Sequence, residues 1–170
     1  MNIAVLKTSG NYCFRPDNTL NREARDYYLP DGVEAVSLTP CIYAKVVKAG
    51  KCIAGRFAGR YVDNFGFGVL LDAASADPME AVCLDGTSYL SGDTLPVSDI
   101  EEAAFEVLVN EEPWYSGGAF SAAMLHDAVV TVSRRSSLRA TDLLAVCLPA
   151  STILHKGDSF SFAGHKVSIL

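Results

Sequence analysis

The side chains most able to bind a metal ion or act as nucleophiles are spread thinly along the sequence. Five cysteines stand at positions 13, 41, 52, 83 and 147, and three histidines at positions 126, 155 and 165. Structural zinc sites need cysteine or histidine ligands in pairs about two to four residues apart, and the sequence has no such pair. We therefore interpret the cysteines as buried or partly buried thiols of a reducing cytosol, with a zinc site as the alternative.

The one pair of adjacent basic residues, Arg134-Arg135, follows the clearest helical pattern in the chain. Ser121 can accept a free first-turn amide, so the pattern predicts a principal helix at about 121–135. The apolar positions spaced i, i+3, i+4 and i+7 are Leu125, Ala128, Val129 and Val132. Two cations suit the negative end of this helix, and we prefer that interpretation to the alternative of an anion site.

Short apolar, β-branched runs predict that strands dominate the rest of the chain. Ala49-Gly50-Lys51 is typical of a turn between two strand-like pieces. The sequence thus indicates a strand-rich α+β fold with one principal helix. The predicted strands are 3–6, 33–38, 42–47, 65–71, 104–110, 143–148, 159–162 and 166–170.

Two aspartates near the end of the chain have a structural explanation before any catalytic one. Asp142 precedes the strand predicted at 143–148, and Asp158 precedes the strand predicted at 159–162. An aspartate at a turn can accept hydrogen bonds from nearby backbone amides. We therefore expect both carboxylates to hold turns together.

Composition and charge exclude several classes of function. The chain has 170 residues, 49% hydrophobic and 20% charged, which is typical of one globular domain. The net charge of −6 argues against electrostatic binding of nucleic acid. The longest apolar runs are far shorter than the roughly 18 residues that span a bilayer. The first residues lack the pattern of a signal peptide, so we expect a cytoplasmic protein with no membrane association.

An ordered set of short motifs in the C-terminal third resembles the fumarylacetoacetate hydrolase family. The family shows "VNGE", a helix ending near "SR…TL", then "GDLI", "GTPAG" and "KPGD" in that order. The corresponding segments here are VNEE (109–112), SR (133–134) with Leu138, DLL (142–144), LPAS (148–151) and KGD (156–158). Weaker similarities are GNY (10–12), residues 36–40 followed by Gly50-Lys51, residues 57–71, and LDGT (84–87).

The resemblance implies a single domain over 1–170 with a mixed β-roll. Residues 1–60 would form N-terminal strands and loops, and residues 61–170 a core that is shortened at about 72–83. Family enzymes cleave, hydrate, decarboxylate or tautomerise 2-oxo and 1,3-dicarbonyl acids. They hold Mg²⁺ or Mn²⁺ on carboxylates, and an E-x-E pair on a strand points both carboxylates to one face.

The expected ligands are not found at the matching positions. The two strand glutamates fall on Asn64 and Gly66, or on 65 and 67 in the adjacent register. Asp63 would face away from that pair, and Asp72 lies eight residues beyond Asn64. The third carboxylate would lie in the shortened segment. Gly66 and Gly68 indicate either a close backbone approach or a pocket wall emptied of carboxylates.

The catalytic histidine and glutamate of the N-terminal loop also have no counterpart, because the matching positions are Arg15 and Asn18. The remaining polar candidates for a site are Tyr12, Arg15, Asp63 and Asn64, and Arg15 can pair with a substrate carboxylate. Pocket positions implied by the resemblance are Gly66, Leu148, Pro149 and Ser151.

We therefore expect an inactive or strongly altered relative that acts as a dimeric binding or assembly protein, without a metal cofactor. A small organic acid is a possible ligand. The alternative is a hydrolase, isomerase or decarboxylase of 2-oxo or 1,3-dicarbonyl acids that uses Mg²⁺ or Mn²⁺. A third interpretation is that only the fold is shared and the function is unrelated.

Overall fold

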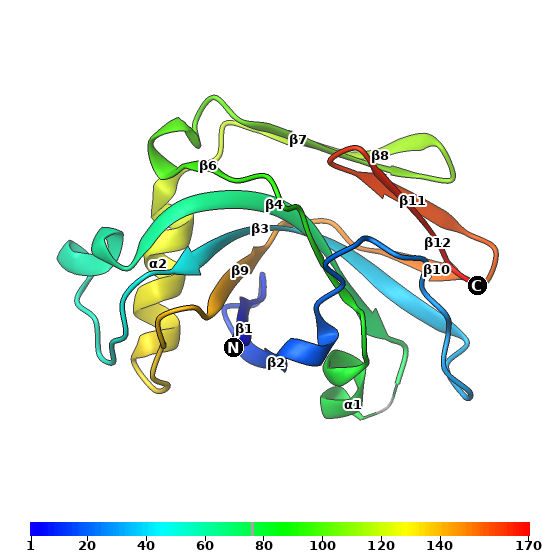
Figure 1. Cartoon of the computed structure of the whole chain (residues 1–170), viewed down its shortest axis with the longest axis horizontal. Coiled ribbons are helices and arrows are strands. Elements are labelled where there is room, and N and C mark those ends of the chain that lie inside the picture. Colours follow the sequence, from blue (N-terminus) through cyan, green and yellow to red (C-terminus); the bar gives the residue numbers. More distant parts are fainter. Residues whose placement is uncertain (76) are drawn as a thin grey trace.

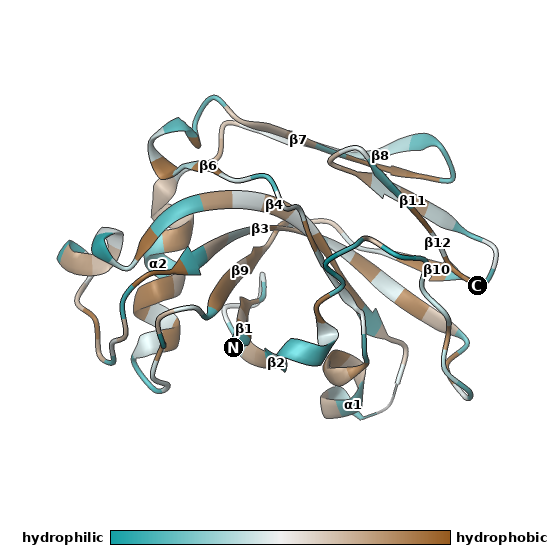
Figure 2. Ribbon diagram, viewed as in Figure 1, coloured by the Kyte–Doolittle hydropathy of each residue, from teal (hydrophilic) through white to brown (hydrophobic). Residues whose placement is uncertain are grey.

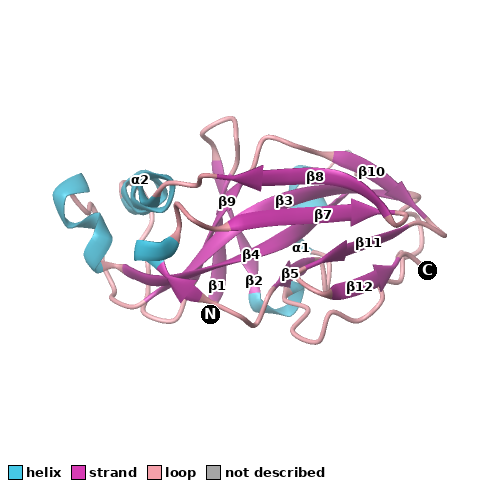
Figure 3. Cartoon of the chain, turned by 90° about the horizontal axis from the view of Figure 1, so that it is seen from above, coloured by secondary structure: helices cyan, strands magenta, loops and turns pink. Residues whose placement is uncertain are grey.

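The structure is a computed structural model that describes residues 1–75 and 77–170. An eight-stranded sheet carries a smaller four-stranded sheet over one end, and helix α2 (Ala122–Ser133) lies against the other end (Figure 1). Figure 3, seen from above, shows α2 end-on beside the sheets, and the core contacts place α2 and the smaller sheet on the same face of the large sheet. The two termini lie on different parts of the molecule (Figure 1).

The order of the large sheet is β2-β1-β9-β3-β4-β5, with β10 beside β3 and β6 beside β4. Its strands are β1 (Asn2–Leu6), β2 (Tyr12–Pro16), β3 (Ala35–Val46), β4 (Val62–Ala73), β5 (Ser88–Leu90), β6 (Leu95–Pro96), β9 (Leu143–Cys147) and β10 (Thr152–His155). The smaller sheet has the order β12-β11-β7-β8. Its strands are β7 (Ala104–Val109), β8 (Glu112–Gly118), β11 (Ser159–Phe162) and β12 (His165–Ser168).

The remaining elements are short. Helix α1 (Pro78–Cys83) begins at Asp77, whose carboxylate accepts a hydrogen bond from the backbone amide of Met79 at 2.8 Å. Three 3₁₀ turns cover Asp17–Thr19, Gly55–Arg60 and Val97–Asp99. No helix of the described ranges, 1–75 and 77–170, has the length and apolarity that crossing a membrane requires.

Most of the core lies between the large sheet and the two structures that cover one of its faces, the smaller sheet and α2. Buried apolar side chains of β3 and β4 pack against α2 and against β7, β11 and β12. Apolar residues dominate α2 in Figure 2, whereas hydrophilic residues gather in the loops. Each fully buried aliphatic side chain of this layer contributes about 1.5–3 kcal/mol. A smaller cluster around Ile3, Val5, Cys41, Leu70 and Ala145 covers the opposite face of the sheet.

The structure confirms the strand-rich α+β class and the principal helix. Leu125, Ala128, Val129 and Val132 are buried, and the Ser121 hydroxyl accepts a hydrogen bond from the amide of Ala123. The strands predicted at 3–6, 65–71, 104–110, 143–148, 159–162 and 166–170 are present with shifted ends. The sequence reasoning missed α1 and the strands β2, β5, β6, β8 and β10.

The two strands predicted at 33–38 and 42–47 are one continuous strand, β3, which runs through Pro40. Strand β9 ends opposite Cys41, and β10 begins opposite Leu38, so Pro40 lies beside the loop that joins them. The Pro40 carbonyl accepts a hydrogen bond from the Leu148 amide in this loop. Proline has no backbone N–H to donate. At Pro40 this causes no loss, because the neighbour on that side is a loop and not a paired strand.

The turn expected at 49–51 does not join two paired strands directly. Gly50 forms an isolated bridge with Leu138, and a 3₁₀ turn at Gly55–Arg60 follows before β4 begins. The two aspartates behave as predicted. Asp142 accepts from the backbone amides of Asn2 and Arg139, and Asp158 accepts from the amide of His155.

Candidate functional site

A polar cavity of about 540 Å³ opens on the face of the large sheet opposite α2. It lies where β1 ends and where the chain crosses from β9 to β10. We call it the Lys7–Asp72 cavity. Its walls include Lys7 and Thr8 after β1, Ser37 and Thr39 on β3, Leu70 and Asp72 on β4, and the turn Cys147 to Ser151.

Strand pairing explains why these side chains share one face. In the antiparallel register of β3 and β4, Ser37 is opposite Asp72 and Thr39 is opposite Leu70. Side chains two residues apart on a strand point to the same side, so all four face the cavity. The Ser37 hydroxyl also meets the Ser151 hydroxyl at 2.7 Å, which ties the sheet to the turn.

The charges of the cavity form one connected group. Lys7 Nζ donates to Asp72 Oδ2 at 2.9 Å, and the Arg15 guanidinium forms an ion pair with Asp72 Oδ1. Two cations therefore share one carboxylate, which leaves a net charge of +1 at the cavity. The Lys7 side chain is 39% exposed, so its ammonium group still has donors directed to solvent.

Arg15 is the innermost member of the group, because its side chain is only 1% exposed. Its guanidinium donates to the carbonyl oxygens of Leu71 and Thr87 at 2.9 and 3.2 Å, and to the hydroxyls of Thr87 and Ser88, each at 3.2 Å. A buried cation needs such partners because desolvation costs several kcal/mol. Arg15 thus joins β2, β4 and β5. Its side chain does not line the cavity.

Burial and charge also set the protonation of the groups nearby. Burial lowers the pKa of Lys7, but the hydrogen bond and the charge of Asp72 outweigh this, so the net shift is upward. Burial raises the pKa of Cys147 to about 11 and also raises that of Cys13. Lys7 therefore stays charged and Cys147 stays a neutral thiol near neutral pH.

Three of the four pocket positions implied by the resemblance lie at this cavity. Leu148, Pro149 and Ser151 line it, and Gly66 does not. A Cβ atom at Gly66 would lie 2.7 Å from the Tyr43 ring, and one at Gly68 would lie 2.4 Å from the Tyr89 carbonyl oxygen. The glycines therefore permit a close approach inside the sheet, and the interpretation as an emptied pocket wall is wrong.

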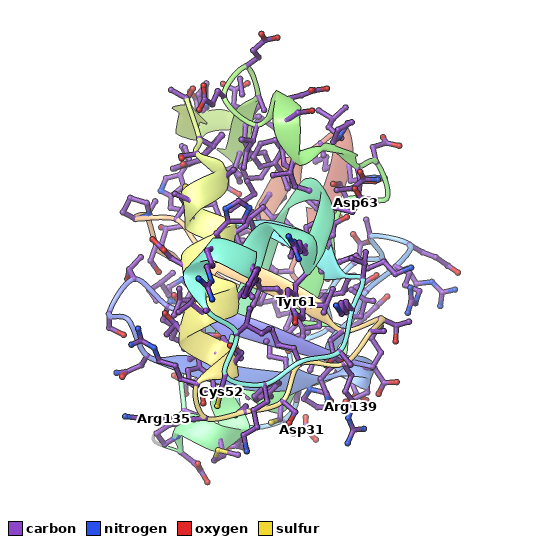
Figure 4. The ribbon with its side chains drawn as sticks, turned by 90° about the vertical axis from the view of Figure 1, so that its left-hand side faces the viewer. Asp31, Cys52, Tyr61, Asp63, Arg135 and Arg139 are labelled. Carbon is purple, nitrogen blue, oxygen red and sulfur yellow. The ribbon has the colours of Figure 1, made fainter. Side chains whose placement is uncertain are left out.

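None of the four polar candidates from the sequence lines the Lys7–Asp72 cavity. Tyr12 points its hydroxyl to the Ser136 hydroxyl at 3.0 Å, near the end of α2. Asp63 and Asn64 are exposed at the start of β4, and Figure 4 shows Asp63 at the surface beyond Tyr61. Asn64 lies six residues from Leu70, or roughly 20 Å along an extended strand. Arg15 alone reaches the cavity, through Asp72.

The alternating pair of β4 that faces the cavity is Leu70 and Asp72, rather than Asn64 and Gly66. One position carries a leucine, and the other carries a carboxylate that two cations already occupy. Mg²⁺ and Mn²⁺ need several free oxygen ligands, carboxylates above all. The cavity residues therefore do not fit such an ion, and the described residues 1–75 and 77–170 contain no cluster of three acidic, histidine or cysteine ligands elsewhere.

Comparisons with known proteins agree on the fold. No protein-family model matches the sequence, and a search of curated proteins finds no similar chain. Fumarylpyruvate hydrolase from Pseudomonas aeruginosa in complex with Mn²⁺ and pyruvate is similar in structure, with a TM-score of 0.81 and 13% identity, covering 100% of this chain and 89% of that one. A protein from Yersinia pestis described as belonging to the fumarylacetoacetate hydrolase family gives a TM-score of 0.80 and 15% identity, covering 99% and 92%.

A third solved structure, 5-carboxymethyl-2-hydroxymuconate delta-isomerase from Mycobacterium smegmatis, gives a TM-score of 0.81 and 12% identity, covering 99% of this chain and 78% of that one. The neighbours thus include both hydrolases and isomerases. At these identities the likeness establishes the fumarylacetoacetate hydrolase fold. The resemblance inferred from the short motifs is confirmed at that level.

Sequence reasoning missed Lys7 and Asp72 as members of a site. One signal was available, because Ser37 and Thr39 are polar and alternate along an otherwise apolar strand. A second signal was the position of Lys7 and Asp72. Each is a charged residue directly after a predicted apolar strand. Neither signal showed that the two ends meet, since β1 and β4 are not neighbours in the sheet.

Proposed function

We propose that the protein is a non-catalytic relative of the fumarylacetoacetate hydrolase enzymes that binds a small organic acid in the Lys7–Asp72 cavity. The observation that carries the proposal is the charge group itself. Where a metal site would need free carboxylates, the cavity has one carboxylate shared by two cations. The net charge of +1 and the hydroxyls of Thr8, Thr39 and Ser151 favour binding of an anion.

The expected contact is an ion pair between a ligand carboxylate and Lys7. This changes the role proposed for Arg15 from the sequence, because the guanidinium already has partners in the fold. A structural neighbour contains Mn²⁺ and pyruvate, which makes pyruvate a suitable first probe. In this protein, pyruvate should bind without added metal.

Calorimetry with pyruvate tests the proposal in metal-free buffer and with Mn²⁺. We expect the same affinity in both, and a loss of about tenfold in Lys7→Met, the change that follows from losing one charge-assisted hydrogen bond. Lys51→Met removes the same charge from an exposed position outside the cavity and should bind as the wild type does. Binding or cleavage of a 2-oxo or 1,3-dicarbonyl acid that requires Mn²⁺ would support the metal-dependent enzyme instead.

We also propose that the protein acts as a homodimer in the cytoplasm. The support for the dimer is the resemblance to the family, and the support for the location is that all five cysteines are free thiols, as is usual in a reducing compartment. Size-exclusion chromatography with light scattering tests the dimer. A single peak at the mass of one chain would contradict it.

A further inference from the structure

A second cavity, of about 560 Å³, lies on the other side of the β1–β2 hairpin, against the C-terminal end of α2. The hairpin contributes Thr8 to the Lys7–Asp72 cavity, and Gly10, Asn11 and Tyr12 to this one. The helix side contributes Thr131, Arg134 and Arg135. We call it the Arg134–Arg135 cavity.

The charges here are unbalanced. Both arginines are exposed, and neither forms an ion pair with any residue in the described ranges 1–75 and 77–170. No carboxylate is among the six lining residues. The whole chain has six more acidic than basic residues, so carboxylates are abundant and yet this pair of cations has none.

The fold brings further donors to the same cavity. Thr131 lies in the last turn of α2, and Arg134 and Arg135 follow the end of the helix directly, so the three residues border the same cavity. The Tyr12 hydroxyl meets the Ser136 hydroxyl at 3.0 Å, which fixes the hairpin against the end of the helix. Asn11, Thr131 and the two arginines, all with hydrogen-bond donors in their side chains, therefore border one space.

Stabilisation of the helix end explains only part of this arrangement. A cation near the C-terminus of a helix interacts favourably with its dipole, and one exposed arginine is enough for that effect. The dipole does not require hydroxyl and amide donors on a facing hairpin. Planar guanidinium groups bind carboxylate and phosphate oxygens in pairs, with geometry that ammonium groups cannot supply.

We propose that the Arg134–Arg135 cavity binds a small dianion, either a phosphate group or a dicarboxylate, through both guanidinium groups. The site is separate from the Lys7–Asp72 cavity and does not depend on the function proposed for that cavity. Because the cavity is larger than one phosphate ion needs, the anionic group would belong to a small molecule.

Calorimetry and thermal melts of the full chain test the proposal with inorganic phosphate and with succinate, each against chloride at equal ionic strength. We expect one or both dianions to bind and to raise the melting temperature beyond the effect of chloride. Binding of phosphate alone, of succinate alone, or of both identifies the source of the anionic group. If neither dianion differs from chloride, the proposal is wrong.

Variants locate the site. Arg134→Gln with Arg135→Gln should weaken binding by about tenfold or more, because charge-assisted hydrogen bonds are lost. Arg139→Gln is the matched control, since Figure 4 shows Arg135 and Arg139 on opposite sides of the end of α2, and Arg139 does not line the cavity. The variants are compared in the Lys7→Met background, so that succinate cannot bind through Lys7 in the other cavity. Full affinity in the double glutamine variant would overturn the assignment.

A lysine pair keeps the test decisive if the glutamine variant fails to fold. Arg134→Lys with Arg135→Lys retains both charges at the end of the helix, so the stability without ligand should match the wild type. Its affinity for the dianion should still fall several-fold, because lysine cannot form the paired contacts. Unchanged affinity would show that net charge alone attracts the anion and would contradict recognition by the guanidinium pair.

Discussion

Two cavities flank one β-hairpin, and they use positive charge in opposite ways. In the Lys7–Asp72 cavity two cations share a carboxylate, and one of them, Arg15, is buried in the sheet. In the Arg134–Arg135 cavity two exposed arginines form no ion pair with any residue of 1–75 and 77–170. The fold depends on the first group of charges. It does not depend on the two exposed arginines, which are therefore free to bind a ligand.

This difference separates structural charge from charge that is free to bind a ligand. A buried cation that loses its counter-ion is strongly destabilising, whereas an exposed cation contributes little to stability. A protein of net charge −6 can pair its cations easily, so the unpaired arginines are the more informative ones. Stability and ligand binding should therefore respond to different substitutions on the two sides of the hairpin.

The largest expected effect is a loss of stability in Asp72→Asn. Without the carboxylate, the Arg15 guanidinium remains buried next to a neutral group, and we expect a loss of about 3 kcal/mol in the free energy of unfolding. Urea denaturation measures it. Asp63→Asn, on the exposed start of the same strand, should change stability by less than about 0.5 kcal/mol. Equal stability of the two variants would mean that Thr87, Ser88 and Leu71 alone satisfy Arg15.

A smaller effect should appear as a change in the pH dependence of stability. Asp72 outweighs burial and raises the pKa of Lys7 in the folded state, so the folded protein holds this proton more tightly than the unfolded chain does. The resulting stabilisation is complete below the unfolded pKa, about 10.4, and is lost as pH rises through the folded pKa.

Denaturation at pH 8 and at pH 11 checks this sign. The wild type should lose more stability between the two values than Lys7→Met does. The difference should be about 0.5–1 kcal/mol, since the pair is partly exposed. A steeper loss in Lys7→Met would contradict the assigned role of Asp72.

The Arg134–Arg135 cavity should give a smaller change in stability still. Arg134→Gln with Arg135→Gln removes only favourable interactions with the helix dipole, so we expect a loss of about 0.5 kcal/mol without added dianion. Thermal melts in chloride measure it, with Arg139→Gln as the control. A loss as large as that of Asp72→Asn would show that these arginines are structural and would remove the contrast between the two cavities.

The sequence predicted the fold better than the site, and particular residues show why. Helix α2 and the buried strands follow from local periodicity, which one segment can carry alone. The sequence did not indicate strand β8. The turn before it is formed by Asn110 and Glu111, both with positive φ, whereas the usual sequence signal for such a turn is Asn-Gly. Helix α1 escaped notice although Asp77 and Pro78 are typical of a helix start.

The site depended on contacts between distant segments. Lys7 and Asp72 are 65 residues apart, and Arg15 and Asp72 are 57 apart. Leu148, Pro149 and Ser151, which the short motifs indicated, line the cavity, and they lie in the turn between two strands. Asn64 and Gly66, which the motifs indicated on β4, do not line it.

The smallest expected effect concerns thiols on the two sides of the molecule and leaves stability unchanged. Cys147 lines the Lys7–Asp72 cavity, and burial raises its pKa to about 11, whereas Cys52 is exposed near the end of α2 (Figure 4). The thiolate is the reactive form, so iodoacetamide should label Cys52 first at pH 8 and Cys147 only as the pH approaches 11. Mass spectrometry after timed labelling measures both rates. Rapid labelling of Cys147 at pH 8 would mean that the cavity is more hydrated than its packing indicates, and Lys7 would then bind a carboxylate more weakly than we expect.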